Sequence, residues 1–186
     1  LTANLGLRHD QDNQGHSQLS PRLGLITKLP ADSVLKLLAG SAFRPPNAYE
    51  SEYAYPGLQI PSDNLKPERV RTLEIAFEQP IGERGRWKVA AFSNRFDDMI
   101  GLVDDGSGIF QFQNVGRAST RGIELGARYR FINGAEMRGS LTRQSSEDAE
   151  GTALTNTPRT LAKLLVRIPV GTHELAWETR FTGERR

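Results

Sequence analysis

The sequence has no cysteine among its 186 residues, so it forms no disulfide and offers no thiolate to a metal. It has no run of about 20 apolar residues, which a membrane-spanning helix needs, and its mean hydropathy is −0.49. Neither sign of charge dominates: 24 Lys and Arg residues against 22 Asp and Glu residues give +2 at pH 7. A charge this small and dispersed does not predict nucleic-acid binding. The absences exclude a disulfide-rich domain and a helical membrane protein, but not a barrel that spans with alternating strands.

Apolar residues make up 37% of the chain, and with the 18 glycines the share is about 47%, which is ordinary for a folded protein, so we do not expect disorder. The sequence shows no secretory signal peptide at Leu1 and starts in a strand-like segment. Its last residues, Thr182-Gly183-Glu184-Arg185-Arg186, look equally unfinished. We therefore expect residues 1–186 to be a fragment of a larger protein.

Alternation of apolar and polar residues is the dominant pattern along the chain. In one segment Ile123, Leu125 and Tyr129 share a face, whereas Glu124 and Arg128 lie on the other. This period of two is typical of a strand with one wet face. No segment sustains a helical period, so helix should be scarce. The pattern predicts an all-β, antiparallel up-and-down meander of about ten strands, at residues 1–8, 21–28, 34–43, 70–79, 86–97, 108–115, 120–131, 135–144, 160–169 and 173–182.

The connections between these strands alternate between long and short. Long ones fall at residues 9–20, 44–69, 98–107 and 145–159, and short ones at 29–33, 80–85, 132–134 and 170–172. Since consecutive antiparallel strands place alternate connections at opposite ends of a sheet, one rim should carry the long loops and the other the turns. This asymmetry is typical of an outer-membrane barrel.

Two settings fit the alternating faces. In a membrane barrel the apolar face meets lipid and the polar face a hydrated lumen, whereas in a soluble sandwich the apolar face meets a second sheet. The long loops favour the barrel. Aromatic residues near the strand ends agree with interfacial girdles, although strands favour aromatics in any case: Trp87, Tyr129 and Phe131 near the turns, and Phe43, Phe96 and Phe181 near the long loops.

Residues typical of metal sites or catalysis occur without the spacing that either needs. The segment from Asp10 to Gly15 begins like a calcium loop, but its twelfth position is Pro21 rather than a bidentate glutamate. His9 and His16 lie in the same loop, and no further ligand has zinc-site spacing. The acidic pairs of residues 97–98 and 104–105 are better explained as solvated loop residues than as paired catalytic carboxylates. We predict no metal site, no cofactor and no enzymatic activity.

A series of short motifs runs along most of the chain: Ser20-Pro21-Arg22-Leu23-Gly24, Gly40-Ser41-Ala42-Phe43-Arg44-Pro45-Pro46, Asn64-Leu65-Lys66-Pro67-Glu68, Thr72-Leu73-Glu74, Asn94-Arg95-Phe96-Asp97-Asp98-Met99-Ile100, Asn114-Val115-Gly116-Arg117-Ala118 and Gly122-Ile123-Glu124-Leu125. Together these motifs resemble the β-barrel of TonB-dependent outer-membrane receptors. The family has a 22-stranded transmembrane barrel closed by an N-terminal plug, and it imports scarce nutrients, typically ferric siderophores, with energy delivered through TonB. The resemblance implies a Gram-negative outer-membrane location, contact with outer-membrane lipid, and a TonB complex that acts through a plug. We find no plug and no TonB box in this sequence, so residues 1–186 are expected to be part of the barrel domain alone.

The loop of residues 44–69 is the best candidate for ligand recognition. Arg44, Tyr49, Tyr53 and Tyr55 offer a guanidinium and three phenols, which suit an anionic or aromatic chelate such as a ferric siderophore. The competing interpretation is that the tyrosines pack this loop onto its neighbours. Two other functions stay open at this point: a soluble all-β carbohydrate-binding or hydrolase domain, and a passive porin-like channel.

Overall fold

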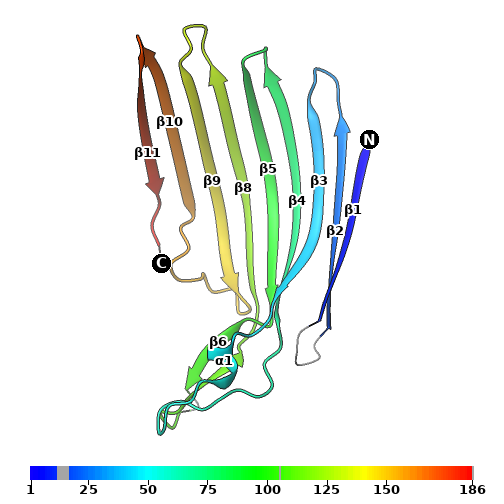
Figure 1. Ribbon diagram of the computed structural model, residues 1–186, viewed down its shortest axis with the longest axis vertical. Helices are drawn as coiled ribbons and strands as arrows, with labels where there is room; N and C mark the ends of the chain where they lie inside the picture. Colours follow the sequence, from blue (N-terminus) through cyan, green and yellow to red (C-terminus); the bar gives the residue numbers. More distant parts are fainter. Residues whose placement is uncertain (12–16, 105, 186) are drawn as a thin grey trace.

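The computed structural model describes residues 1–11, 17–104 and 106–185. Its main feature is one antiparallel sheet of nine strands in which each strand pairs with the next wall strand along the chain, from β1 to β11 (Figure 1). The strands of this wall are β1 (Thr2–Gln11), β2 (Ser17–Lys28), β3 (Val34–Arg44), β4 (Glu68–Ile81), β5 (Gly85–Asp97), β8 (Ala118–Arg130), β9 (Glu136–Asp148), β10 (Thr160–Val170) and β11 (His173–Thr182). The prediction of an all-β antiparallel meander is confirmed.

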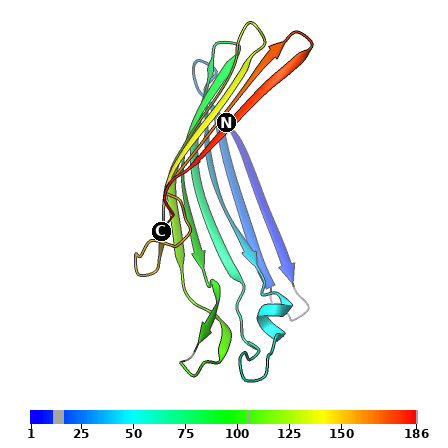
Figure 2. The same cartoon turned by 90° about the vertical axis from the view of Figure 1, so that its left-hand side faces the viewer.

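The two ends of the wall differ as the loop lengths predict. Short turns at residues 29–33, 82–84, 131–135 and 171–172 join strands at one rim. The connections of residues 45–67 and 98–117 project together beyond the other rim (Figure 2). The first contains the short helix α1 (Ala48–Glu52), and the second contains the hairpin of β6 (Ile100–Asp104) and β7 (Phe110–Asn114). We call this end the loop rim and the other the turn rim.

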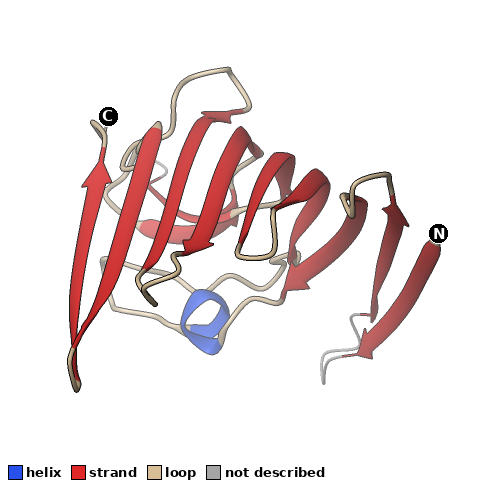
Figure 3. Cartoon of the chain, turned by 90° about the horizontal axis from the view of Figure 1, so that it is seen from above, coloured by secondary structure: helices blue, strands red, loops and turns tan. Residues whose placement is uncertain are grey.

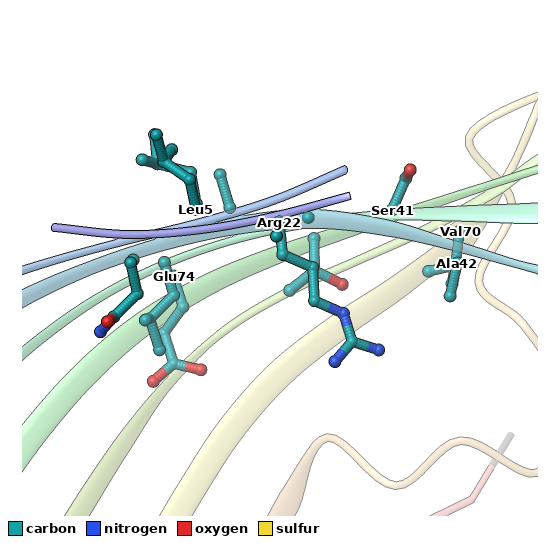
Figure 4. Close-up of a pocket in the computed structure, with 14 residues that line it drawn as sticks. Leu5, Arg22, Ser41, Ala42, Val70 and Glu74 are labelled. Atoms are coloured by element: carbon teal, nitrogen blue, oxygen red, sulfur yellow. The ribbon is translucent and has the colours of Figure 1, made fainter. Parts of the chain in front are cut away.

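The wall has one apolar and one polar face. Leu37, Ile75, Ala91 and Ile123 are successive register partners across β3, β4, β5 and β8, so they lie on the same face. The sheet is curved, and α1 lies on its concave side (Figure 3). Figure 4 shows Leu5 and Ser41 on one side of the wall and Arg22 and Glu74 on the other, which is the concave side. The convex face therefore carries the apolar set.

The apolar residues of the convex face are left open. Leu73, Ile123 and Leu175 expose 52%, 54% and 63% of their surface, and within the described residues no second sheet covers this face. Among the described residues five apolar ones are buried, and all but Leu65 are alanines. No helix within residues 1–11, 17–104 and 106–185 is long and apolar enough to cross a membrane. In the described part of the chain the convex face is therefore apolar and uncovered.

Two expectations from the sequence need correction. The strand expected at residues 108–115 is not part of the wall, because its core forms β7 and pairs with β6 inside the loop-rim connection. Phe96 is the register partner of Val70, and Figure 4 shows Val70 on the concave side, so Phe96 does not join the aromatic residues of the convex face. Helix is scarce, as expected: α1 has five residues, and it starts at a capping box in which Asn47 and Glu50 bond each other's backbone amides.

Candidate functional site

The two long connections at the loop rim are joined into one body, which we call the loop unit (residues 45–67 and 98–117). Backbone bonds link them directly: the Ile60 amide donates to the Phe110 carbonyl at 3.0 Å, and the Phe110 amide to the Leu58 carbonyl at 2.7 Å. The Ser62 hydroxyl donates to the Phe112 carbonyl at 2.6 Å. Because both connections have their own regular structure, the loop unit presents a defined surface at the loop-rim end of the concave face.

Asn114 holds the base of the loop unit with three side-chain hydrogen bonds. Its Oδ1 accepts from the Lys66 amide at 2.8 Å, and its Nδ2 donates to the Lys66 carbonyl at 3.0 Å. The same Nδ2 donates to the Asp98 carbonyl at 2.7 Å. Asn114 therefore satisfies backbone groups that would otherwise lack partners where the chain leaves the wall.

Arg44, at the end of β3, connects the wall to α1. Its guanidinium makes a two-pronged contact with Glu50, from Nη1 at 2.8 Å and Nη2 at 2.9 Å. Its Nε donates to Glu68 Oε2 at 2.7 Å, and the other Glu68 oxygen accepts from the Ile100 amide at 2.8 Å. One arginine and one glutamate thus join both long connections to the strands that carry them.

The contacts of this cluster also shift the ionisation of Glu50. The hydrogen bonds from Arg44 lower the pKa of the Glu50 carboxyl, and the Asn47 amide, which donates to it at 2.9 Å, adds to the effect, while burial opposes it. The carboxylate is therefore the stable form at neutral pH, as the two-pronged contact requires.

Three tyrosines and a phenylalanine form the aromatic surface of the loop unit. The Tyr49 and Tyr53 rings lie 4.6 Å apart between centroids, and Phe112 meets Tyr49 edge-on at 5.7 Å. Tyr49, Tyr53 and Tyr55 expose 54%, 39% and 55% of their surface. Among the described residues no hydrogen bond engages their phenol hydroxyls. The Tyr49 and Tyr53 rings thus pack against each other, and all three tyrosines remain partly exposed.

The structure places the three predicted tyrosines in the loop unit and Arg44 beside it, at the end of β3. Arg44 already bonds two carboxylates and anchors the loop, whereas the tyrosines present a free surface. Sequence reasoning did not single out Phe112, whose contact with Tyr49 spans two connections. It also gave no role to Glu68 or Asn114, although both lie in the motifs quoted above. Their partners are 16 to 48 residues away, so no local pattern pointed to them.

Between the loop unit and the turn rim, the concave face carries charged side chains that pair across neighbouring strands. Lys36 Nζ lies 2.6 Å from Glu78 Oε1, and Lys88 Nζ lies 2.6 Å from Glu124 Oε1. Arg86 reaches the second Glu78 oxygen at 3.4 Å. The pairs run across β3, β4, β5 and β8, so this face suits a hydrated passage rather than a packed core.

Other residues considered in the sequence have simpler roles or are not described. Asp97 is not a solvated loop residue: it is 8% exposed and contacts Arg71, Arg95 and Arg117. His16 and most of the calcium-like segment, residues 12–16, lie outside the described residues. Within the described ranges, no three His, Cys, Asp or Glu residues are grouped to hold a metal ion.

Several solved structures share the fold of this wall. The siderophore receptor PirA from Acinetobacter baumannii matches 99% of this chain with a TM-score of 0.80 and 20% identity. A mutant ferric enterobactin receptor, PfeA, from Pseudomonas aeruginosa, in complex with enterobactin, matches 97% with a TM-score of 0.80 and 22% identity. The FrpB iron transporter from Neisseria meningitidis matches 89% with a TM-score of 0.66 and 19% identity. The matches cover 32%, 30% and 27% of those chains, so this chain spans about a third of their length or less.

The protein-family comparison covers nearly the whole chain. The family described as TonB dependent receptor-like, beta-barrel, matches residues 1–185. This match agrees with the nine-stranded meander, the long-loop rim and the exposed convex face. The chain therefore belongs to the TonB-dependent receptor family and forms part of its β-barrel.

Proposed function

We propose that this chain is part of the wall of an outer-membrane receptor that imports a ferric siderophore or a similar scarce nutrient with energy delivered through TonB. The convex face would meet the lipid of the Gram-negative outer membrane, and the loop unit would face outward to receive the ligand. A plug domain elsewhere in the receptor would contact TonB and release the ligand along the charged concave face. This chain would carry out no covalent chemistry.

The aromatic surface of the loop unit is the observation that supports this proposal most strongly. Tyr49, Tyr53 and Tyr55 are exposed on a body fixed by hydrogen bonds rather than on a free loop. Aromatic rings and phenol hydroxyls together suit a chelate with aromatic or anionic groups. Because the surface is organised before the ligand arrives, binding costs little loop ordering. Tyr49, Tyr53 and Tyr55 are the proposed ligand contacts, and Arg44 is the proposed positioning residue.

Growth on different iron sources tests the import of such a ligand. A strain in which the parent gene is deleted is supplied with single ferric catecholates, ferric hydroxamates or haem, with and without the plasmid-borne full-length receptor. We expect growth to depend on the receptor for one class, and to be lost when TonB is also absent. Receptor-dependent uptake that persists without TonB would instead support the passive channel.

Binding to the purified full-length receptor tests the site. With the ferric ligand identified by growth, the double variant Y49A/Y53A should weaken binding by about tenfold or more, because each aromatic contact contributes about 0.5–1.5 kcal/mol. The control is Y129A, which removes a tyrosine from the convex face near the turn rim. Equal affinity for Y49A/Y53A and the unmodified receptor would show that these rings only pack the loop.

A further inference from the structure

Four arginines form a diagonal row on the convex face near the loop rim, which we call the arginine row (Arg71, Arg95, Arg121 and Arg143). Arg71 and Arg95 are direct register partners on β4 and β5. Arg121 pairs with Ser93, two residues from Arg95, and Arg143 pairs with Ile123, two residues from Arg121. Directly opposite or diagonal neighbours lie within about 5–8 Å of each other, so the four charges form one cluster.

The row lies where the apolar part of the convex face ends. On β8 the outward residues from the turn rim are Tyr129, Ala127, Leu125 and Ile123, and then Arg121. Eight residues separate Tyr129 from Arg121, which is about 26 Å along the strand and about 20 Å after a tilt of about 40°. This approaches the height of a membrane barrel's apolar band, about 25 Å. The row is therefore level with the lipid headgroups on the side of the long loops.

The positive charge of the row is only partly neutralised. Its ion pairs go to one carboxylate, Asp97, which lies 2.9 Å from Arg71 and 3.3 Å from Arg95 and also meets Arg117 at 3.4 Å. Among the described residues, Arg121 and Arg143 have no ion pair. Both are exposed. Like charges on neighbouring strands repel each other, so an anion bound between Arg121 and Arg143 would stabilise this pair.

Arg121 and Arg143 also share a surface depression. Together with Ile123, Ser145 and Arg159 they line an open hollow of about 520 Å³. Two guanidiniums at its edge suit a phosphate, because arginine binds phosphate oxygens in pairs and is weakly hydrated. The apolar neighbour Ile123 suits the first carbons of an acyl chain below the headgroup.

We propose that the arginine row binds the phosphate of a lipid headgroup in the outer leaflet, with Arg121 and Arg143 as the main contacts. This inference rests on the proposed placement of the wall in the membrane with the loop unit outward, but not on the identity of the imported ligand. The bound lipid would neutralise the row and hold the wall at a fixed height in the bilayer.

Lipid binding to the full-length receptor in detergent micelles tests this site. The probe is fluorescent phosphatidic acid, compared with fluorescent phosphatidylcholine, whose phosphate is masked by a choline. We expect tighter binding of phosphatidic acid, weakened about fivefold by R121Q or R143Q alone and about 25-fold by R121Q/R143Q. The control R128Q removes an arginine of the same strand from the opposite face and should leave the affinity unchanged.

Several results would overturn the proposal. Equal binding of the two lipids would contradict the site, as would binding of phosphatidic acid by R121Q/R143Q that is as tight as binding by the unmodified receptor. A loss of affinity for phosphatidic acid in R128Q as large as the loss in R121Q would also contradict it. Displacement of phosphatidic acid by the same concentration of inorganic phosphate would assign the site to free phosphate instead. If R121Q/R143Q fails to fold, the single variants carry the test, with R121K, which keeps the charge, expected to retain more affinity than R121Q. Binding of the ferric ligand, measured in parallel, distinguishes failure of this site from failure of the proposed receptor function.

Discussion

Replacing Asn114 by alanine removes the three side-chain hydrogen bonds that hold the two long connections together. They are the bonds with the Lys66 amide at 2.8 Å, the Lys66 carbonyl at 3.0 Å and the Asp98 carbonyl at 2.7 Å. Each contributes about 0.5–1.5 kcal/mol net. Since the site is partly exposed and water replaces some of the loss, we expect the free energy of opening the loop unit to fall by about 2–3 kcal/mol.

Hydrogen exchange on the full-length receptor measures this change directly. The Lys66 amide, which donates to Asn114 in the native protein, should exchange about 30- to 150-fold faster in N114A. Amides of the wall, such as that of Leu73, should be unaffected. The control is Q113A, because the neighbouring Gln113 only donates to Gln111 at 3.3 Å. Unchanged exchange at Lys66 in N114A, or the same acceleration in Q113A, would refute this role for Asn114.

Three further changes test other parts of the structure in the full-length receptor. G122A should lower the free energy of unfolding by about 1–3 kcal/mol, because a Cβ at this position would lie 2.6 Å from a ring carbon of Phe92 and 2.8 Å from a backbone oxygen. The control is G139A, whose Cβ would have its nearest atoms 3.9 Å away and should be tolerated. A denaturant titration measures both variants. L125R should destabilise the protein in lipid vesicles by about 2–4 kcal/mol, whereas T142R on the concave face should not; equal losses would contradict the assignment of the faces. Folding lowers the pKa of Glu50 below its ordinary value of about 4.5. The contact with Arg44 therefore stabilises α1 fully at any pH above this ordinary value, and the stabilisation is lost as the pH falls through the lowered pKa. Proteolysis of the loop unit should therefore be constant from pH 7 to about 5 and rise only in more acid buffer, and E50Q should remove this change; a rise near pH 6 would contradict the assignment.

The wall strands were predictable because apolar and polar residues alternate along each of them. Successive side chains of a strand point to opposite faces, so the alternation in segments such as residues 120–131 shows both that the segment is a strand and which residues share a face. The observed strands differ from the expected ones mainly at their ends. The loop rim was predictable from loop length alone.

The loop unit was less predictable, because its contacts join segments far apart in the sequence. Residues 110–114 alternate as well as any wall strand, and no local signal separates a small hairpin from the wall. A global signal was present. A wall strand at residues 108–115 would have placed the tight turn at residues 132–134 on the loop rim, against the pattern of the other connections. The capping box of Asn47 and Glu50 was a second signal that we did not use.

The most direct test of the whole account is the position of single cysteines in the membrane of intact cells. The chain has no cysteine of its own, so each introduced thiol is the only one it contributes to the receptor. A maleimide that does not cross membranes should label Y55C, in the exposed loop unit, on intact cells. It should label N133C, in the turn between β8 and β9, only after the cells are opened. Labelling of N133C but not Y55C on intact cells would contradict the proposed orientation and the receptor function that depends on it.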